Sequence, residues 1–356
     1  MEKKALVGMS GGVDSSVAAF LMQQHQYSCI GATMRLHGSR EDNSCGGSDD
    51  IEDARAVARR LGIPHYVFDF SQDFDSRVIA DFVRSYEQGL TPNPCIQCNK
   101  HLKFRCLLDR AIALGCDYVV SGHYARIRQD DKTGRYLLYK AADRVKDQTY
   151  FLACLEQDQL AHIQFPLGEL TKEEVRAIAR EQSFVNARKR DSQDICFVPH
   201  GDYVAFMEAW TGKTYPQGDY LDLNGNVLGQ HKGAVCYIIG QRKGLGIALG
   251  APAYVCRKDM QANTVTLGPN DALFSKGLVA DNWNWFPFPI LTEPLSVTAK
   301  IRHSQHEQSA TVYPGENGTA KVMFDDPQRA ITPGQAVVLY DGDLVIGGGT
   351  IRKALW

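Results

Sequence analysis

Short apolar runs alternate with segments of helical spacing along roughly the first 125 residues of the chain. The apolar runs of strand length lie at residues 4–9, 29–35, 65–70 and 116–123, and the predicted helices between them lie at residues 17–25, 48–62 and 103–115. The helix at 48–62 begins at serine and aspartate residues suited to capping and ends at a glycine. Repeated strand–helix units of this length predict an α/β fold built on a doubly wound parallel sheet.

The hydrophobic pattern changes after about residue 125. It predicts a hairpin at residues 125–140 and helices at residues 146–160 and 171–182. From about residue 213, glycine, proline and short alternating runs dominate, and five or six strands from residue 276 onward fit a small β-barrel or sandwich. We therefore expect the doubly wound domain at residues 1–205, a small mixed or β-rich central domain at 206–272 and a C-terminal β-barrel at 273–356.

Composition narrows the class of protein without identifying it. The chain has 356 residues, of which 44% are hydrophobic and 22% charged, as in soluble globular proteins with a large core. It shows no signal peptide and no apolar run near the ~18 residues of a membrane span, so we expect a cytoplasmic protein with no membrane partner. The net charge of -2 leaves nucleic-acid binding open, because phosphate contacts need only a local basic patch.

The stretch GMSGGVDSSVAAF, which begins at Gly8, carries the first candidate chemistry. A predicted strand runs into Gly11 and Gly12, whose missing side chains let the backbone approach a ligand. The helix that follows presents N–H groups to phosphate oxygens. The lysine of a Walker A loop is missing, and the bland alternative is a tight strand–helix turn with a Ser or Asp cap. The pattern resembles the loop of PP-loop pyrophosphatases, which cleave ATP between its α and β phosphates to make adenylates.

The second candidate chemistry rests on three cysteines. Cys95 and Cys98 form a C-x-x-C directly behind two prolines, and Cys196 stands in DSQDICF. Such a pair can hold a metal, cycle as a disulfide or place one nucleophilic thiolate. An adenylating amide synthetase has no use for placed thiols. A sulfur-transfer enzyme needs one cysteine to carry a persulfide and another to resolve it.

Taken together, the motifs resemble one family along nearly the whole chain. They are GMSGGVDSSVA, TPNPCIQCNKHLKF, SGHYAR, KDQTYFL, FPLGELTKEEVR, DSQDICF, IGQRKGLGI, KIRH and PGQAVVLY. They are similar to the bacterial tRNA-specific 2-thiouridylases (the MnmA/TrmU family). The resemblance implies a PP-loop (HUP-like) domain followed by a central domain and a barrel. It also implies tRNA-uridine 2-sulfurtransferase activity, in which the C2 carbonyl oxygen of the wobble uridine is adenylated before sulfur transfer.

The resemblance also implies a site. For ATP and Mg²⁺ it implies Gly8, Met9, Ser10, Gly11, Gly12, Val13, Asp14 and Ser15, with Met34 and Gly122 near the adenosine and Asp14 as a catalytic residue. For tRNA it implies Asn93, Pro94, Cys95, His123, Lys146, Asp147, Gln148, Arg302, His303 and Gln335. Cys98 is the implied nucleophile, and Cys196 the persulfide carrier and disulfide partner of Cys98. The implied partners are tRNAs with Lys, Glu and Gln type anticodons and a sulfur-relay or cysteine-desulfurase donor protein.

One departure leaves an alternative open. Many family members have Asp where this chain has Cys95, so Cys95, Cys98 and Cys196 could instead hold a [4Fe–4S] cluster with one iron open for sulfide. We favour persulfide chemistry, with Cys95 as a bystander. Two other functions compete with thiolation: a PP-loop amide synthetase, and a non-catalytic tRNA-binding protein with a metal-stapled C-x-x-C. The intact SGGVDS argues against the second.

Overall fold

The computed structural model describes residues 2–36, 47–189, 195–198 and 201–356. The chain divides into two compact units. The first comprises Met1–Ile79, Pro94–Phe197 and Gly342–Ile346, and the second comprises Ala80–Asn93, Val198–Asp341 and Gly347–Trp356. Within the described part of the chain, no helix has the length and apolarity needed to cross a bilayer.

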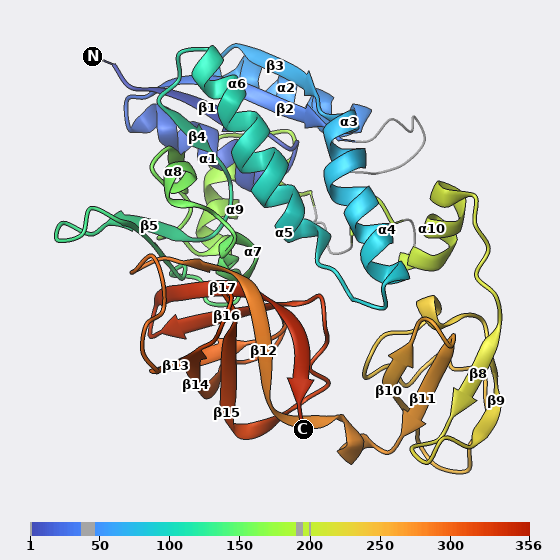
Figure 1. Ribbon diagram of the computed structural model, residues 1–356. Coiled ribbons are helices and arrows are strands. Elements are labelled where there is room, and N and C mark those ends of the chain that lie inside the picture. The colour runs from blue at the N-terminus through green and yellow to red at the C-terminus, as the bar shows by residue number, and fades with distance from the viewer. Residues whose placement is uncertain (1, 37–46, 190–194, 199–200) are drawn as a thin grey trace. The chain divides into compact units, whose positions relative to one another are not determined.

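The first unit is built on the predicted parallel sheet, which the structure confirms (Figure 1). Its strand order is β3 (His65–Asp69), β2 (Ser28–Arg35), β1 (Lys4–Gly8), β4 (Tyr118–Val120) and β7 (Ile163–Gln164), and all neighbours are parallel. The central residues of β1, Ala5 to Val7, are completely buried. Burial on both faces explains why this strand is a continuous apolar run.

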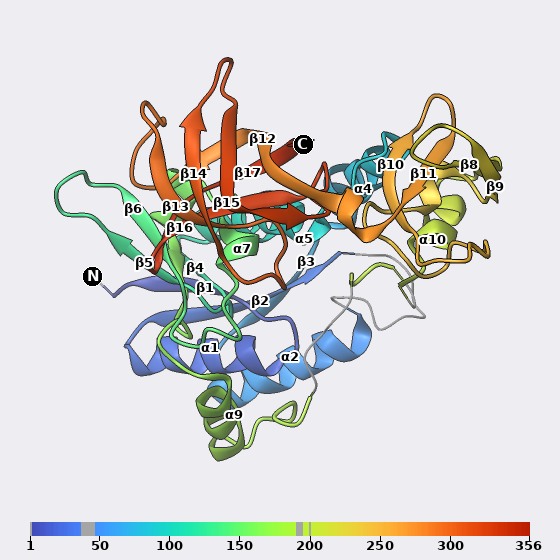
Figure 2. The ribbon, with the colours of Figure 1, turned by 90° about the horizontal axis from the view of Figure 1, so that it is seen from below.

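Helices cover both faces of this sheet, as Figure 2 shows. On one face lie α1 (Val13–Gln24) and α2 (Ser48–Leu61), with α9 (Lys172–Glu181) packed against α1; on the other lies α6 (Leu107–Ala113). The buried residues of α1 include Val17, Ala18 and Ala19. Small side chains let this helix approach the sheet closely, and only residues 9–12 separate its first residue from the end of β1.

Several helices depart from the prediction. A helical stretch that was not predicted runs through α3 (Ser71–Phe74), the π-helix η1 (Asp75–Ile79) and α4 (Ala80–Glu87). The helix predicted at 103–115 begins earlier, with α5 (Pro94–Cys98) and the π-helix η2 (Asn99–Cys106) leading into α6. The region predicted as a helix at 146–160 holds two single turns, α7 (Thr149–Leu152) and α8 (Gln157–Leu160). The predicted hairpin is confirmed as β5 (Arg126–Gln129) and β6 (Tyr136–Tyr139).

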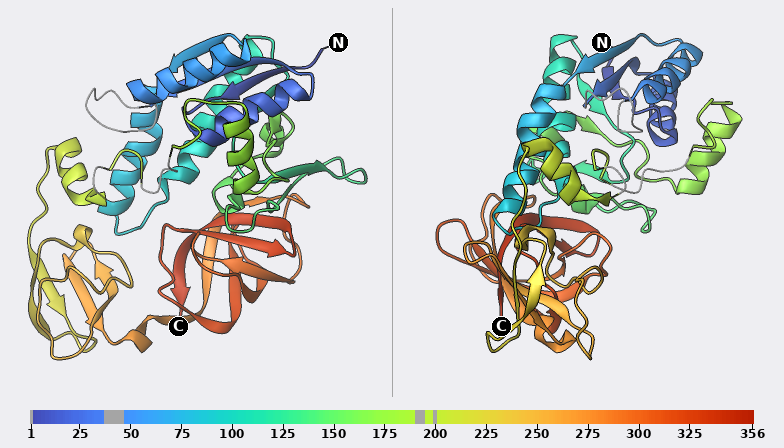
Figure 3. Two further views of the ribbon diagram at one scale, coloured as in Figure 1. Left: turned by 180° about the vertical axis from the view of Figure 1, so that it is seen from behind. Right: turned by 90° about the vertical axis from the view of Figure 1, so that its right-hand side faces the viewer.

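The second unit contains a closed barrel and a smaller sheet, both visible in Figure 3. The barrel strands follow the order β12 (Phe274–Trp285), β15 (Ala320–Arg329), β14 (Gln308–Pro314), β13 (Leu295–Lys300), β16 (Ala336–Asp341) and β17 (Leu344–Leu355), and β17 pairs back with β12. The smaller sheet has the order β10 (Tyr254–Asp259), β11 (Thr264–Gly268), β8 (Gly218–Leu221) and β9 (Val227–His231), and α10 (Tyr203–Thr211) precedes it in the chain. The predicted C-terminal β-barrel is therefore confirmed as a six-stranded barrel.

Candidate active site

A tight loop joins β1 to α1 at the carboxyl edge of the parallel sheet. β1 ends at Gly8 and α1 begins at Val13. The chain order of the strands reverses beside β1, and such switch points are where open α/β sheets bind ligands. Gly12 is the N-cap of α1, and no side chain caps it. The first-turn N–H groups of a helix have no acceptor within the helix, so this terminus suits phosphate oxygens.

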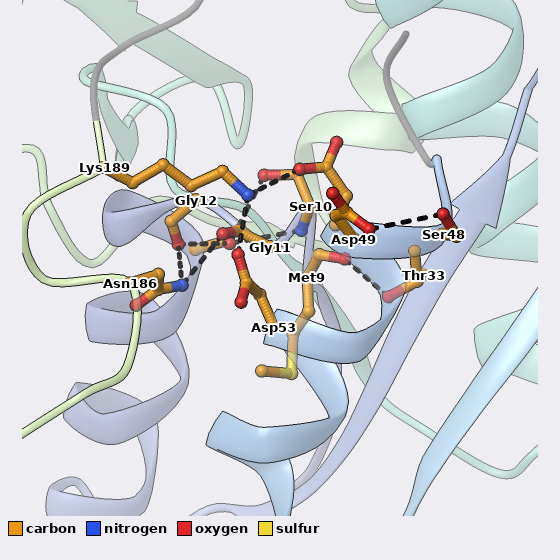
Figure 4. A network of polar contacts seen from close by, with 12 residues as sticks. Met9, Ser10, Gly11, Gly12, Thr33, Ser48, Asp49, Asp53, Asn186 and Lys189 are labelled. Atoms are coloured by element: carbon orange, nitrogen blue, oxygen red, sulfur yellow. Dashed lines mark hydrogen bonds and ion pairs between the residues drawn. The ribbon is translucent and has the colours of Figure 1, made fainter. Parts of the chain in front are cut away.

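Hydrogen bonds fix the path of the loop, as Figure 4 shows for several of its residues. The amide of Ser10 donates to Ser15 Oγ at 3.2 Å, and the Ser15 hydroxyl donates to the Gly12 carbonyl at 3.1 Å. The Thr33 hydroxyl of β2 donates to the Met9 carbonyl at 2.7 Å. The loop is therefore held before any ligand arrives, which lowers the entropy lost on binding.

Asn186, which the sequence analysis did not identify, secures the glycines of the loop. Its Nδ2 donates to the Gly11 carbonyl at 2.9 Å, to the Gly12 carbonyl at 3.2 Å and to Ser16 Oγ at 3.0 Å (Figure 4). The side chain of Asn186 is buried, so these bonds are shielded from water. Because carbonyls are occupied in this way, the loop is left to offer N–H groups rather than oxygens to a ligand.

Asp14, in the first turn of α1, is held by a cation and a phenol. Lys172 Nζ lies 2.8 Å from both carboxylate oxygens, and the Tyr124 hydroxyl donates to Oδ1 at 2.9 Å. The Lys172 side chain is only 11% exposed, so this ion pair is better shielded than a surface pair. Gly122 lies against the same turn, where a Cβ would come within 2.8 Å of the Ser15 nitrogen. Asp14 and Gly122 could be predicted from the sequence, whereas Lys172 and Tyr124 could not.

The structure brings the expected ATP-binding residues to one edge of the sheet. The loop and first turn comprise Gly8, Met9, Ser10, Gly11, Gly12, Val13, Asp14 and Ser15. Met34 lies on β2 two residues after Ala32, which pairs with Gly8. The N-terminus of α1, which no side chain caps, fits a polyphosphate. The contact of each residue with ATP remains a prediction.

Cys95 and Cys98 lie on one short helix but differ in exposure. α5 covers Pro94–Cys98; Cys95 is exposed, whereas Cys98 is 8% exposed. The π-helix η2 follows at once, and Cys98 is its N-cap residue. π-helical turns are rare in proteins, and many of those that occur lie at functional sites. The buried thiol thus lies at the junction of two helix types, and the exposed thiol lies one turn before it.

Side chains from the segment after α7 hold α5 and η2 by their carbonyl groups. Cys154 Sγ lies 3.5 Å from the Ile96 carbonyl, to which the thiol donates. Gln159 Nε2 donates to the Lys100 carbonyl at 3.1 Å and to the Phe104 carbonyl at 2.8 Å, and the Gln159 side chain is buried. A π-helix breaks the α-helical ladder, and buried carbonyls need another donor. Gln159 is therefore a positioning residue for the helix that carries Cys98.

We expect Gln159→Leu to lower the free energy of unfolding by about 2 kcal/mol or more, because two buried carbonyls lose their donor. The same change should alter the rate at which iodoacetamide alkylates Cys98, read by peptide mass spectrometry. Gln129→Leu is the matched control, since its amide donates to the Gly134 carbonyl at an exposed position. Equal melting and equal alkylation of the two variants would show that Gln159 does not hold η2.

The third cysteine, Cys196, is partly exposed and belongs to the same unit as Cys98.

Burial raises the pKa of the Cys154 thiol to about 12, and the nearby Cys98 adds to this, so Cys154 stays protonated at neutral pH. Among the residues that the structure describes, no three His, Cys, Asp or Glu side chains form a group that could hold a metal ion. Whether Cys95, Cys98 and Cys196 hold an iron–sulfur cluster remains a prediction.

His123, expected to contact tRNA, is buried in the first unit. Its Nδ1 lies 2.6 Å from Ser121 Oγ, and its ring lies against the rings of Phe104 and Phe165. Burial, followed by the positive charge of Lys103, holds the pKa of His123 well below its usual range. The imidazole is therefore neutral at pH 7, and its contact with tRNA remains a prediction.

The expected tRNA residues Lys146, Asp147 and Gln148 lie directly before α7, of which Gln148 is the N-cap. Asp147 is buried, and its Oδ1 accepts from the Ala141 amide at 3.0 Å. The Gln148 Oε1 accepts from the amide of Tyr124 at 2.9 Å, so this side chain orders the residue whose hydroxyl holds Asp14. The side chains of Asp147 and Gln148 thus accept hydrogen bonds from the backbone. Contact with tRNA remains a prediction for all three residues.

The other expected tRNA residues are Asn93, Arg302, His303 and Gln335 in the second unit and Pro94 and Cys95 in the first. Arg302 Nη2 donates to the Ala330 carbonyl at 2.5 Å, within the barrel. Gln335 Nε2 donates to the Thr91 carbonyl at 3.0 Å, and the Thr91 amide donates to the Pro333 carbonyl at 2.9 Å. The barrel thus holds the residues that lead into the C-x-x-C helix.

Comparisons with known protein families match all three parts of this architecture. The family model described as tRNA methyl transferase HUP domain matches residues 3–200, the tRNA methyl transferase PRC-barrel domain matches 205–269 and the Aminomethyltransferase beta-barrel domain matches 275–351. With its lysine-free glycine loop, the chain is thus a HUP-domain protein of the PP-loop class. It is 49% identical to the tRNA-specific 2-thiouridylase MnmA of Acetivibrio thermocellus, covering 99% of both chains, and 48% identical to that of Clostridioides difficile, covering 100% of this chain and 99% of the other. The chain belongs to the tRNA-specific 2-thiouridylase family.

Solved structures resemble parts of the chain. A 4-thiouridine synthetase–RNA complex with bound ATP aligns with a TM-score of 0.36 at 15% identity, over 59% of this chain and 50% of that one. The U34-tRNA thiolase NcsA from Methanococcus maripaludis with its [4Fe-4S] cluster aligns with a TM-score of 0.36 at 19% identity, over 58% of this chain and 66% of that one. Likenesses of this extent carry no argument about function.

Proposed function

We propose that the chain catalyses ATP-dependent 2-thiolation of the wobble uridine of tRNA and releases AMP and pyrophosphate. The observation that carries the proposal is the pairing of a phosphate loop with thiols in one compact unit. The loop passes through Gly11, where no side chain fits, and the same unit holds Cys98 and Cys196. Membership of the 2-thiouridylase family supports the choice of substrate. We also propose that the chain has three domains, with boundaries after residues 205 and 272.

The first step activates the uridine. Its C2 carbonyl is amide-like and a poor electrophile, so its oxygen attacks the α-phosphate of ATP and pyrophosphate leaves. The N–H groups at the start of α1 suit the phosphates because they offer donors and a positive dipole end. Mg²⁺ bound with the phosphates would supply further positive charge, and the carboxylate of Asp14, which also pairs with Lys172, is the kind of oxygen ligand that such hard cations prefer.

The second step delivers sulfur. The terminal sulfur of a persulfide on Cys196 attacks C2 of the adenylated uridine, and AMP leaves with the former carbonyl oxygen. The thiolate of Cys98 attacks the sulfur that remains on Cys196, so the persulfide S–S bond breaks and a Cys98–Cys196 disulfide forms. A two-electron reductant, such as a dithiol, then restores both thiols. A donor protein of the sulfur-relay or cysteine-desulfurase kind reloads Cys196.

Recognition of tRNA requires an exposed uridine and many phosphate contacts. We propose that the wobble base is flipped out next to Asn93, Pro94 and Cys95, because enzymes must unstack a base before they modify it. The tRNAs are those with Lys, Glu and Gln type anticodons, and the site of action is the cytosol. Binding should weaken steeply with salt, because each neutralised phosphate releases counterions.

The experiment that tests the proposal is mass spectrometry of nucleosides from tRNA incubated with the protein, ATP, Mg²⁺ and a persulfide donor. We expect 2-thiouridine together with one pyrophosphate per sulfur transferred. ATP-dependent amidation without thiouridine would select the amide synthetase. Binding of tRNA without release of pyrophosphate would select the non-catalytic protein with a metal-stapled C-x-x-C.

Cys95→Asp separates persulfide chemistry from cluster chemistry. As a bystander on the exposed side of α5, Cys95 can be replaced, so we expect the variant to keep at least about a third of wild-type thiolation. Protein prepared anaerobically should need no iron. An active brown wild type, with thiolate-to-iron absorption near ~400 nm, beside an inactive colourless variant would establish the cluster instead. Cys106→Asp provides a control for adding a carboxylate at a partly exposed cysteine of the following π-helix.

A further inference from the structure

Lys189 holds two carboxylates beside the phosphate loop. Its Nζ lies 2.7 Å from Asp50 Oδ1 and 2.7 Å from Asp53 Oδ2, both on the first two turns of α2 (Figure 4). Partial burial acts to lower the pKa of Lys189, but the hydrogen bonds and charges of the two carboxylates outweigh it and raise the pKa overall. Lys189 is therefore a full cation at neutral pH.

This cation is tied to the loop from two sides. The Lys189 amide donates to the Asn186 carbonyl at 2.9 Å, and the Asn186 side chain donates to the carbonyls of Gly11 and Gly12. On the α2 side, a Cβ on Gly11 would come within 2.7 Å of the Asp50 Cα, so the backbone of Asp50 touches the loop. Asn186 and Asp50 thus each contact both Lys189 and the loop. Figure 4 shows Lys189 and the loop within one network of polar contacts.

The loop has a need for such a cation. A triphosphate brings up to four negative charges, whereas the loop itself has no lysine or arginine. Lys172 contacts the first turn of α1, but its Nζ lies 2.8 Å from both carboxylate oxygens of Asp14, and its side chain is 11% exposed. The Lys189 side chain is 35% exposed, and a partly exposed ion pair is weak enough to exchange partners. A lysine on its flexible stem can also turn toward a new anion.

We propose that Lys189 is a phosphate-binding residue of the ATP site, which exchanges Asp50 and Asp53 for the β- and γ-phosphates when ATP binds. In the empty site the two carboxylates keep the ammonium beside the loop. In the occupied site it neutralises the pyrophosphate that leaves on adenylation. This inference rests on the proposed function only in requiring that ATP is a substrate.

The test is a double-mutant cycle on ATP affinity, measured by calorimetry on the full chain with Mg²⁺. Lys189→Gln should weaken ATP binding about tenfold or more, since one charge-assisted contact is lost, and should leave AMP binding unchanged. The Asp50→Asn/Asp53→Asn pair should tighten ATP binding because it removes the competing partners. In a protein that already carries Lys189→Gln, the two aspartate substitutions should also tighten ATP binding less. The gain in affinity should be at least about threefold smaller than the gain that they give in the wild type.

The coupling distinguishes exchange from general repulsion. If the carboxylates only repel ATP, removing them gives the same gain with or without Lys189, and additive changes overturn the proposal. Unchanged ATP affinity in Lys189→Gln, with a lowered melting temperature, would also overturn it and leave Lys189 as a structural strut. Lys213→Gln is the matched control, because its ion pair with Glu87 lies in the second unit. Failure of the wild type to bind ATP would instead reject the proposed function.

Discussion

Cys196→Ser is expected to adenylate tRNA and to transfer no sulfur. Activation of the uridine depends on the loop between β1 and α1, whereas the persulfide requires the sulfur atom of Cys196, which a hydroxyl cannot replace. Pyrophosphate release with tRNA should stay within about threefold of wild type for the first turnover, while 2-thiouridine falls at least about 10³-fold, a loss of more than 4 kcal/mol in transition-state stabilisation. Both products can be measured from one reaction.

Two further variants make this result specific. Cys236→Ser removes another partly exposed thiol, from the second unit, and should thiolate like the wild type. Cys98→Ser should still adenylate and should accept labelled sulfur on Cys196, but should not turn over. Normal thiolation by Cys196→Ser would remove Cys196 from the mechanism, and loss of adenylation in it would show that this segment also shapes the ATP site.

The centre of the sheet could be predicted because β1 is a continuous run of apolar residues whose central positions are completely buried. The unpredicted helix from Ser71 to Glu87 also has a signal. Its buried residues Phe74, Val78, Phe82 and Tyr86 recur every four positions, which is helical spacing. The π-turns η1 and η2 have no comparable signal. In η2, the carbonyls of Lys100 and Phe104 accept from Gln159, which lies in another segment.

The site could be predicted only in part, because local motifs identify the loop but not its neighbours. Asp14 and Lys172 are 158 residues apart in sequence, and Gly11 and Asn186 are 175 apart, so no spacing rule links them. In the sequence, Lys189 lies in the basic stretch ARKR at residues 187–190, and nothing there indicates a carboxylate partner. The structure instead pairs it with carboxylates beside the loop. Charges in this site are thus arranged by tertiary packing, which periodicity and motif spacing do not report.

The two glycines of the loop look alike in sequence and differ in structure. Gly11 has φ +72°, a conformation that side chains with a Cβ rarely adopt, and an added Cβ would come within 2.7 Å of the Asp50 Cα. Gly12 has φ -90°, and its nearest neighbour would be Ser10 Oγ at 3.4 Å, an ordinary contact. The first position therefore requires glycine, and the second tolerates alanine.

Gly11→Ala is accordingly expected to slow adenylation about 100-fold or more, whereas Gly12→Ala keeps it within about fivefold of wild type. The methyl group on Gly11 forces either the loop or the start of α2 to move, and misplacement of reacting groups by about 1 Å costs on the order of 100-fold in rate. The measurement is tRNA-dependent pyrophosphate release, with thermal melting to show that both variants fold and AMP binding to show that the adenosine site survives. Equal activity of the two variants would mean that the close approach of Asp50 to Gly11 does not shape the phosphate site. A larger loss in Gly12→Ala than in Gly11→Ala would place the essential backbone approach one residue further along the loop.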